Sequence, residues 1–511
     1  SKINKRIKLD LKDVKFLLDP YNLTANIITK DPTVLIEGSK LEIKEIKTNI
    51  SLKSLIFNEF SLDDLQISTK SIKIEDLILL ARYFKNSSEL FLLNRVIKDG
   101  FLSADINLEF DEEGNIKNNY QITGFVKDIK LNFLNKIKAN NLSFKFKIQK
   151  KRYSFTKIRG DINEIGLSSP LIEINKNNDQ FLIEGKILSK KKEFNADQIN
   201  ILKANFLKNI KIKKVRFSSE NEISFNLNKK LKIDNLDIRS KVNLDQLVVK
   251  NDFINLKSYL PDLEELINFE KHKIIISYTD GKLDIEGNGE ILVKDKFDSL
   301  NYEVTKNNDH FAFNAKAKFK NSKLLIKFLE YEKKENLDAS IEIKGNVKKN
   351  NSINFDLISL IENDNTILFK NLNLSKDFKL TNIDSFNFNY LNNKQVKNQL
   401  LLKKINSNYN IVGESFDATK LINKILDSDD TNSSLFHNLN SKITLKINKT
   451  YIDEINFINK LSGVLSFKNN KIDNLNLVST FPNNKKVNLT VKINEKKEKI
   501  TKFFTDYPKP L

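Results

Sequence analysis

The sequence predicts a mostly β fold in which one elongated, twisted antiparallel sheet is rolled into an open groove, with a few peripheral helices. Three observations support this prediction. Apolar and polar side chains alternate along many short stretches of the 511-residue chain, turn-forming residues separate these stretches, and segments with helical spacing are few. Strands that follow one another through short turns pair in the antiparallel sense.

The alternating stretches define the candidate residues of the groove. In residues 142–148, apolar side chains at every second position share one face, and Ser143, Lys145 and Lys147 occupy the other. The same pattern recurs along the chain. The candidates for the apolar wall are Leu142, Phe144, Phe146, Ile148, Phe311, Phe313, Phe319, Phe386, Phe388, Ile443, Leu445, Val487, Leu489 and Val491. Ordinary packing against a facing sheet or helix explains any single one of them equally well.

Three segments have helical rather than strand spacing. Residues 75–98 predict a helical hairpin, because two apolar helical runs flank a few turn-forming residues. Residues 260–273 carry Pro261 and early acidic residues, which favour the start of a helix. Residues 416–426 predict a further helix with Asp417 as its N-cap.

No composition boundary divides the sequence into independent domains. The chain has only 13 Gly and 7 Pro, and it contains no linker rich in Pro, Gly or Ser and no exact short repeat. We therefore expect residues 1–511 to form one continuous β-groove, with soft joints near residues 195–215 and 255–275 and with the three helical segments as insertions.

The formal net charge is +20, and lysine accounts for most of it. Phosphate recognition in nucleic-acid binding favours the bidentate guanidinium group of arginine, and only a few of the 86 basic residues are Arg. We interpret the lysines mainly as solvated faces of the sheet. Attraction to anionic lipid headgroups is the second interpretation. Nucleic-acid binding is the third, and we expect no nucleic-acid partner.

The residues needed for common enzymatic chemistry are scarce. The chain has no Cys, its three His residues lie far apart, and no phosphate-binding loop or nucleophile elbow occurs. Residues 287–290 contain a lone Gly-x-Gly between strand runs, which predicts a turn or bulge. Residues 427–434 are acidic but lack the Gly and the closing Glu of a calcium loop. We expect no enzyme, no cofactor and no metal site.

A sheet of this length has an apolar face that must be covered. About 25 strands at ~4.8 Å each would extend the sheet over roughly 120 Å. Such a face exceeds what a soluble monomer exposes, so the chain must form two packed sheets, a closed barrel or a rolled groove. A groove suits a lipid acyl tail, because hydrating about 16 carbons costs about 13 kcal/mol at ~0.8 kcal/mol per methylene.

Two stretches resemble the AsmA-like superfamily, the AsmA, TamB and YhdP types of bacterial bridge-like lipid transfer protein. One is residues 59–82, a strand followed by a short helical run, and the other is residues 410–426 with the strands that follow. The second stretch contains the Gly-x-x-Phe-Asp turn of Gly413, Phe416 and Asp417. The resemblance implies a Gram-negative periplasmic protein that an N-terminal helix, absent from this chain, anchors in the inner membrane. It also implies a groove that carries phospholipid toward the outer membrane.

The leading hypothesis is therefore a non-enzymatic periplasmic lipid-transfer protein whose groove conducts phospholipid tails between the two membranes and contributes to outer-membrane biogenesis. The sequence has no Met, even at position 1, so we expect an excerpt of a longer protein that reaches both membranes through parts missing here. The alternative is a structural or adhesive β-sandwich protein of the cell envelope, which predicts packed cores and no bound lipid.

Overall fold

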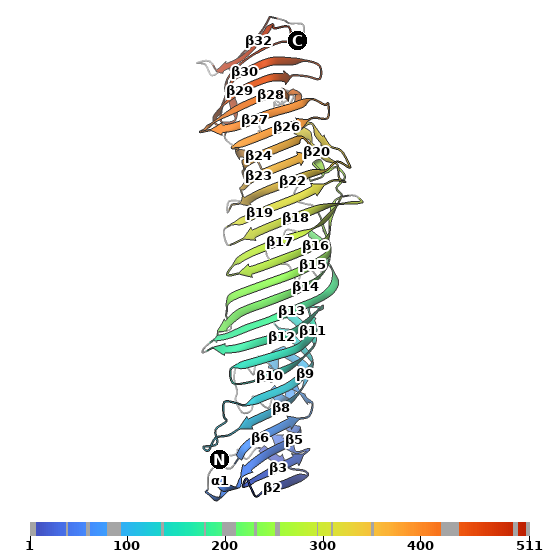
Figure 1. Cartoon of the computed structure of the whole chain (residues 1–511), viewed down its shortest axis with the longest axis vertical. Coiled ribbons are helices and arrows are strands. Elements are labelled where there is room, and N and C mark those ends of the chain that lie inside the picture. The colour runs from blue at the N-terminus through green and yellow to red at the C-terminus, as the bar shows by residue number, and fades with distance from the viewer. Residues whose placement is uncertain are drawn as a thin grey trace. The chain divides into compact units, whose positions relative to one another are not determined.

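The computed structural model confirms the mostly β, open-sheet fold. In the part of the chain that the structure describes, about 75% of the residues are strand, 31 strands belong to one sheet, and β20 and β21 form a separate two-stranded hairpin. Figure 1 shows the strands with the few short helices beside them. The structure describes residues 7–36, 39–57, 62–78, 94–133, 137–177, 180–196, 211–228, 232–250, 256–293, 295–307, 310–348, 352–420, 439–493 and 499–506.

Contacts divide the chain into two compact units. Unit 1 comprises residues 1–192, 218–241 and 278–280, and unit 2 comprises the remaining residues, 193–217, 242–277 and 281–511. The joints expected near residues 195–215 and 255–275 stay a prediction.

Unit 1 is a ladder of antiparallel strands. Its strands and helix are β1 Ile7–Asp10, β2 Val14–Asp19, β3 Thr24–Lys30, β4 Thr33–Ile36, β5 Ser39–Ser51, α1 Leu52–Ile56, β6 Leu62–Thr69, β7 Ile72–Lys73, β8 Ile97–Glu109, β9 Gln121–Phe133, β10 Ile137–Ile148, β11 Arg152–Ile162, β12 Ile165–Asn177 and β13 Gln180–Asn195, whose last residues belong to unit 2. They pair in the order β2–β3–β5–β6–β8–β9–β10–β11–β12–β13.

Unit 2 also consists mainly of antiparallel strands, and some of its connections between strands are longer. Its elements are η2 Leu256–Ser258, β16 Leu266–Thr279, β17 Lys282–Val293, β18 Lys296–Lys306, β19 Phe311–Phe319, β20 Leu324–Ile326, η3 Lys327–Leu329, β21 Tyr331–Lys333, β22 Ala339–Val347, β23 Ile353–Glu362, β24 Asn365–Leu374, β25 Leu380–Asn382, β26 Ser385–Leu391, β27 Lys397–Ile405, β28 Asn408–Asp417, β29 Ser441–Tyr451, β30 Phe457–Lys468, β31 Lys471–Thr480, β32 Lys486–Ile493 and β33 Lys499–Thr505. Strands β14 Lys211–Asn228 and β15 Ile233–Lys250 contribute residues to both units.

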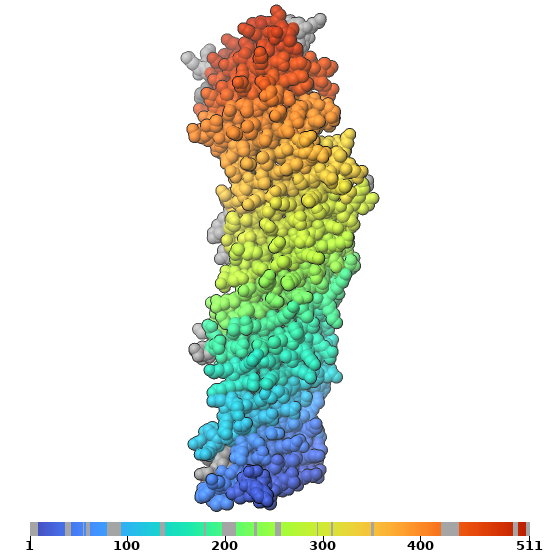
Figure 2. All heavy atoms as spheres, in the orientation of Figure 1, coloured from blue at the N-terminus to red at the C-terminus, as the bar shows by residue number. Residues whose placement is uncertain are grey.

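Pairing in unit 2 runs from each strand to a near neighbour in the chain. From β17 the order is β17–β18–β19–β22–β23–β24–β26–β27–β28, all antiparallel, and β29 to β33 form a second antiparallel run. Strands β28 and β29 join the two runs in the parallel sense. A parallel pair needs a crossover of a dozen or more residues, which residues 418–440 supply. In Figure 2 the residues of β17 to β33 follow one another as bands from yellow-green to red.

The helix predicted over residues 260–273 is wrong, because Leu266–Thr279 forms strand β16. The apolar residues with helical spacing, Leu260, Leu263 and Ile267, are all buried in one cluster, but Leu260 and Leu263 precede the strand and only Ile267 belongs to it. A turn that leads into a strand, with both burying their apolar residues in the same core, thus produces a spacing that imitates a helix.

The other two helical segments lie partly outside the described residues. Residues 74–78 and 94–96 are helical, residues 79–93 are not described, and β8 already begins at Ile97. In the segment 416–426, β28 continues to Asp417 and residues 419–420 are helical, whereas residues 421–426 are not described.

Candidate functional site

Cross-strand pairing in unit 2 places apolar side chains in three parallel rows on one face of the sheet. The middle row is Tyr302, Ala315, Ile343, Ile358, Phe369, Phe386, Leu402, Ile411, Leu445, Gly463, Leu477, Leu489 and Phe503, each residue paired with the next. The inner row is Leu300, Ala317, Ile341, Leu360, Ile367, Phe388, Leu400, Gly413, Ile447 and Leu461. The outer row comprises two paired runs, Val304, Phe313, Gly345, Phe355 and Leu372, and Tyr409, Ile443, Leu465, Leu475 and Val491. We call the three rows the apolar lane.

The opposite face of the same strands carries most of their polar side chains, with a few apolar ones such as Leu368 and Leu401 among them. Lys316 pairs with Glu342 in the register of β19 and β22, and Lys316 Nζ lies 3.1 Å from Glu342 Oε1. Asn314 Nδ2 donates a hydrogen bond to Glu303. Successive side chains of a strand point to opposite faces, so the alternation in the sequence separates an apolar face from a solvated one.

All of the groove candidates predicted in unit 2 lie on the face of the apolar lane. Phe313, Phe386, Leu445 and Leu489 are residues of its rows, and Phe319 and Val487 extend the rows by pairing with Ala339 and Ser479. The candidates in unit 1, Leu142, Phe144, Phe146 and Ile148, pack together in one apolar cluster around Val126 and Ile129. Their role in holding a ligand stays a prediction.

Side chains of the lane differ in how far they are covered. Phe319, Phe388, Val487 and Val491 are buried, most of the middle row is half-buried, and Phe503 at its end is 49% exposed. The half-buried side chains contact their neighbours along the sheet and still present part of their surface to solvent.

The chain itself covers part of the inner row. The segment Leu324–Lys333, which we call the cover segment, packs Leu324, Leu329 and Tyr331 against the inner row in one buried cluster. The Tyr331 ring lies edge-on to the Tyr390 ring at 5.8 Å between centroids, and Tyr390 Oη donates a hydrogen bond to Leu329 O at 3.0 Å. The inner row is therefore closed at this place by protein, and Phe319 and Phe388 belong to this core.

Buried polar groups hold the cover segment in place. Lys333 is 0% exposed, and its Nζ donates hydrogen bonds to the carbonyl oxygens of Lys320 at 2.9 Å and Ser322 at 2.6 Å. Burial lowers the pKa of Lys333. Tyr331 Oη donates to the buried carboxylate of Glu362, and burial, then this hydrogen bond, raise the pKa of Tyr331. Buried polar groups with hydrogen-bond partners of this kind act as structural anchors.

The Gly-x-Gly of residues 287–290 does not form the expected turn or bulge. It lies inside β17, which pairs with β18 in continuous register. A Cβ on Gly287 would lie 2.3 Å from Tyr302 Cζ, and a Cβ on Gly289 would lie 2.3 Å from His272 Cδ2. The two glycines thus leave room for rings that lie flat across the strand. Sequence analysis missed this role, whose only signal is a Gly at every second position of an alternating stretch.

The two rings are also hydrogen-bonded to each other. His272 is 2% exposed, its Nε2 lies 3.0 Å from Glu290 O, and its Nδ1 lies 3.3 Å from Tyr302 Oη. A carbonyl oxygen only accepts, so Nε2 carries the proton and Nδ1 accepts from the tyrosine hydroxyl. Burial lowers the pKa of His272 and raises the pKa of Tyr302 to about 12, so both groups stay neutral.

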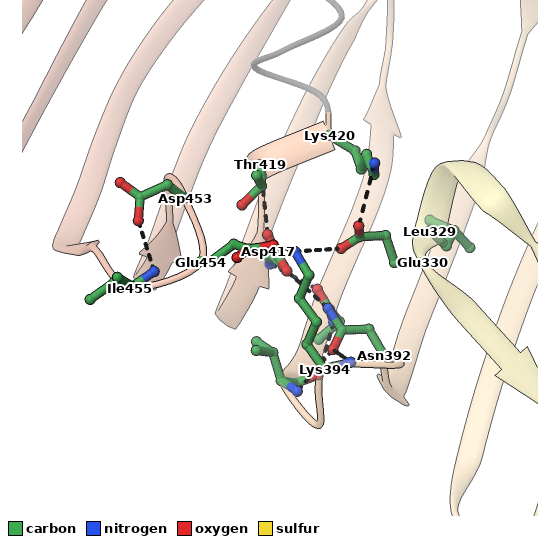
Figure 3. Close-up of polar contacts among 12 residues, drawn as sticks. Leu329, Glu330, Asn392, Lys394, Asp417, Thr419, Lys420, Asp453, Glu454 and Ile455 are labelled. Carbon is green, nitrogen blue, oxygen red and sulfur yellow. Dashed lines mark hydrogen bonds and ion pairs between the residues drawn. The ribbon is translucent and has the colours of Figure 1, made fainter.

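Charged side chains balance each other along the rim of the sheet nearest the inner row, which we call the inner rim (Figure 3). Glu330 Oε2 lies 3.6 Å from Lys394 Nζ, and Glu330 Oε1 lies 3.8 Å from Lys420 Nζ. Lys394 Nζ also lies 3.3 Å from Glu454 Oε1. Lys394 and Lys420 are therefore paired with neighbouring carboxylates.

Unit 1 carries an apolar row of its own. It is formed by Ile46, Ile67, Ile106, Ile122, Ile148, Tyr153, Ile174 and Ile183, each paired with the next. A depression of about 210 Å³ lies on the opposite face and is lined by Glu45, Lys47, Gln66, Ser68, Asp105 and Asn107. Its polar lining does not suit an acyl tail.

Comparison with known proteins gives no family assignment: no family model and no curated protein matches the sequence. The part of the chain that the structure describes contains no group of three or more His, Cys, Asp or Glu residues able to hold a metal ion. None of its helices has both the length and the apolar composition needed to cross a bilayer.

Proposed function

We propose that the protein binds lipids by their acyl tails on the apolar lane of unit 2 and moves them along it, without catalysing a reaction. The observation that carries this proposal is the unbroken pairing of the middle row from Tyr302 to Phe503, with most of its side chains only half-buried. A half-buried apolar row leaves apolar surface that a hydrocarbon chain can cover.

The dimensions and energies of the lane fit acyl tails. Adjacent strands lie about 4.8 Å apart, so the middle row extends over roughly 58 Å between β18 and β33. One acyl tail is about 15 Å long, half the thickness of a hydrocarbon core of about 30 Å, so the row has room for several tails placed end to end. Each methylene removed from water contributes about 0.8 kcal/mol, wherever along the row it lies. Positions along the row are therefore similar in energy, which favours sliding.

The cover segment sets the limit of the lane. It closes the inner row with Tyr331 and Leu329, so tails lie on the middle and outer rows. The resemblance to the AsmA-like superfamily supports phospholipid as the cargo, transport between the inner and outer membranes, and a periplasmic location in a Gram-negative bacterium as parts of the same proposal.

A pair of neighbouring substitutions tests the proposal. Ile358 lies in the middle row, whereas Leu357 lies on the polar face, where it pairs with Lys344 and Lys370, and both side chains are half-buried. We expect Ile358→Glu to reduce the phospholipid that co-purifies with the protein several-fold and Leu357→Glu to leave it unchanged. Circular dichroism and thermal unfolding check that both variants fold.

A photocrosslinker gives an independent readout. Benzoylphenylalanine at Phe313 of the outer row should label lipid tails, and the same group at Lys316 on the polar face should not. Equal labelling at both positions, or wild-type protein that carries no lipid after gentle purification, would refute the proposal and favour a β-sandwich protein of the cell envelope.

A further inference from the structure

The rim of unit 2 nearest the outer row, which we call the outer rim, is rich in lysine. It comprises the turns and strand ends from β18 onward, where β18, β22, β24, β27 and β30 end and β29 begins. Its lysines with no side-chain partner recorded in the described part of the chain are Lys348, Lys376, Lys379, Lys403, Lys442, Lys468 and Lys471. All are exposed except the half-buried Lys379.

Acidic residues at the outer rim are fewer. They include Asp377, Asp384 and Asp473, and Asp384 already accepts hydrogen bonds from Asn371 and Asn382. Among the described residues, the outer rim therefore carries more lysines than carboxylates and has an excess of positive charge.

The inner rim differs in this respect. Lys296 Nζ lies 3.0 Å from Glu335, and Lys323 Nζ lies 2.8 Å from Glu332. Lys394 is held between Glu330 and Glu454, as Figure 3 shows. The two rims of one sheet thus differ in charge: the inner rim is balanced and carries the cover segment, and the outer rim is cationic and borders the outer row.

We propose that the outer rim binds the phosphate esters of lipid headgroups while the tails lie in the apolar lane. This inference rests on the proposed function. A lysine ammonium binds phosphate as a point charge, which suits a headgroup that moves past successive residues. Turns on one rim recur at every second strand, about 10 Å apart, which lies close to the screening length of about 8 Å at physiological ionic strength. A headgroup that moves along the outer rim therefore comes within range of the next lysine while it is still attracted by the previous one.

The test compares two triple variants with the same change in charge. Lys376→Gln, Lys442→Gln and Lys468→Gln together remove three charges from the outer rim. Lys397→Gln, Lys485→Gln and Lys486→Gln together remove three from strand ends and a turn on the inner-rim side, where these lysines are exposed as well.

Two lipids with identical tails serve as probes, dioleoylphosphatidylglycerol and dioleoylglycerol, each presented in the same neutral detergent and counted by native mass spectrometry. We expect wild-type protein to prefer the phospholipid at least ten-fold. The outer-rim variant should lose this preference, by up to roughly five-fold per lysine, the effect of one such charge at an anionic lipid surface. The inner-rim variant should keep it.

Each outcome separates the two proposals. If both lipids bind equally to wild-type protein, or if the two variants behave alike, the outer-rim inference fails while tail binding on the lane stands. If neither lipid binds, both proposals fail.

Two further arms identify the source of the phosphate. Inorganic phosphate that saturates the protein and displaces no lipid would show an anion site unrelated to headgroups. An outer-rim variant that pellets less with dioleoylphosphatidylglycerol vesicles but binds the same number of lipids would show a membrane-docking surface. Either result would overturn the inference.

Discussion

Replacing Tyr331 with phenylalanine should loosen the cover segment from the inner row. The ring is 1% exposed and its hydroxyl donates to Glu362, a carboxylate that is 4% exposed. After the substitution, Glu362 keeps the hydrogen bond from Asn365 Nδ2 at 3.1 Å and loses the one from the tyrosine. The aromatic packing against Tyr390 remains, so the change isolates one hydrogen bond.

The magnitude follows from the kind of bond that is lost. A buried hydrogen bond to a charged group contributes about 1.5–3 kcal/mol. Opening of the cover segment should therefore become roughly 10- to 150-fold more frequent, since every 1.4 kcal/mol is about a factor of ten. Amide hydrogen exchange measures such local opening directly. Peptides that span Leu324–Lys333 should exchange faster by this factor, and peptides from β32 should not change.

Two controls make the result decisive. Tyr259 in the same unit is 46% exposed, so Tyr259→Phe should leave the exchange of the cover segment unchanged. The double variant Tyr331→Phe with Glu362→Gln should increase the exchange by less than the two single substitutions predict when their free energies are added, because both remove the same contact. Exchange of the cover segment that is equal in wild-type protein and Tyr331→Phe would refute the assignment of this hydrogen bond as its anchor.

Two further predictions concern the rings that lie across β17. Gly287→Ala should destabilise the protein by about 1–3 kcal/mol in urea unfolding, because the new Cβ meets the Tyr302 ring, whereas Gly166→Ala, whose Cβ has its nearest neighbour at 3.6 Å, should cost nothing. Burial lowers the pKa of His272, so the unfolded chain binds the proton more tightly and stability should fall as the pH drops below about 6.5. His272→Gln should flatten the dependence between pH 7 and 5, and the same change at the exposed His310 should not; identical pH profiles for the two variants would contradict the geometry.

The alternation in the sequence predicted which side chains of a strand lie on the apolar face of the sheet. The strand register explains why this prediction was correct. Phe386 in β26 and Leu489 in β32 lie six strands apart in chain order, yet both belong to the middle row, because a strand returns to the same face at every second residue. A pattern that depends only on this period requires no knowledge of distant contacts.

Features that break the period or depend on distant packing could not be predicted in this way. Leu260 and Leu263 lie before β16 and Ile267 lies within it, yet all three are buried in one cluster, so their helical spacing comes from tertiary packing and not from a helix. The cover segment presents a second case, because Leu324 and Tyr331 become buried through contact with residues that lie both before and after them in the chain, such as Leu263 and Tyr390. The glycines of β17 are a third, since the ring that needs Gly287 comes from the next strand.

Because most strands of unit 2 pair with near neighbours in the chain, unit 2 resembles a repeat protein in which each unit contacts only the adjacent ones. Its stability is then approximately a sum of hairpin terms and of terms between adjacent hairpins, without a single nucleus on which the rest depends. Evolution can lengthen or shorten such a ladder by whole hairpins while every remaining contact is preserved. The parallel pair of β28 and β29 is the exception, because its partners are farther apart in the sequence than those of a hairpin.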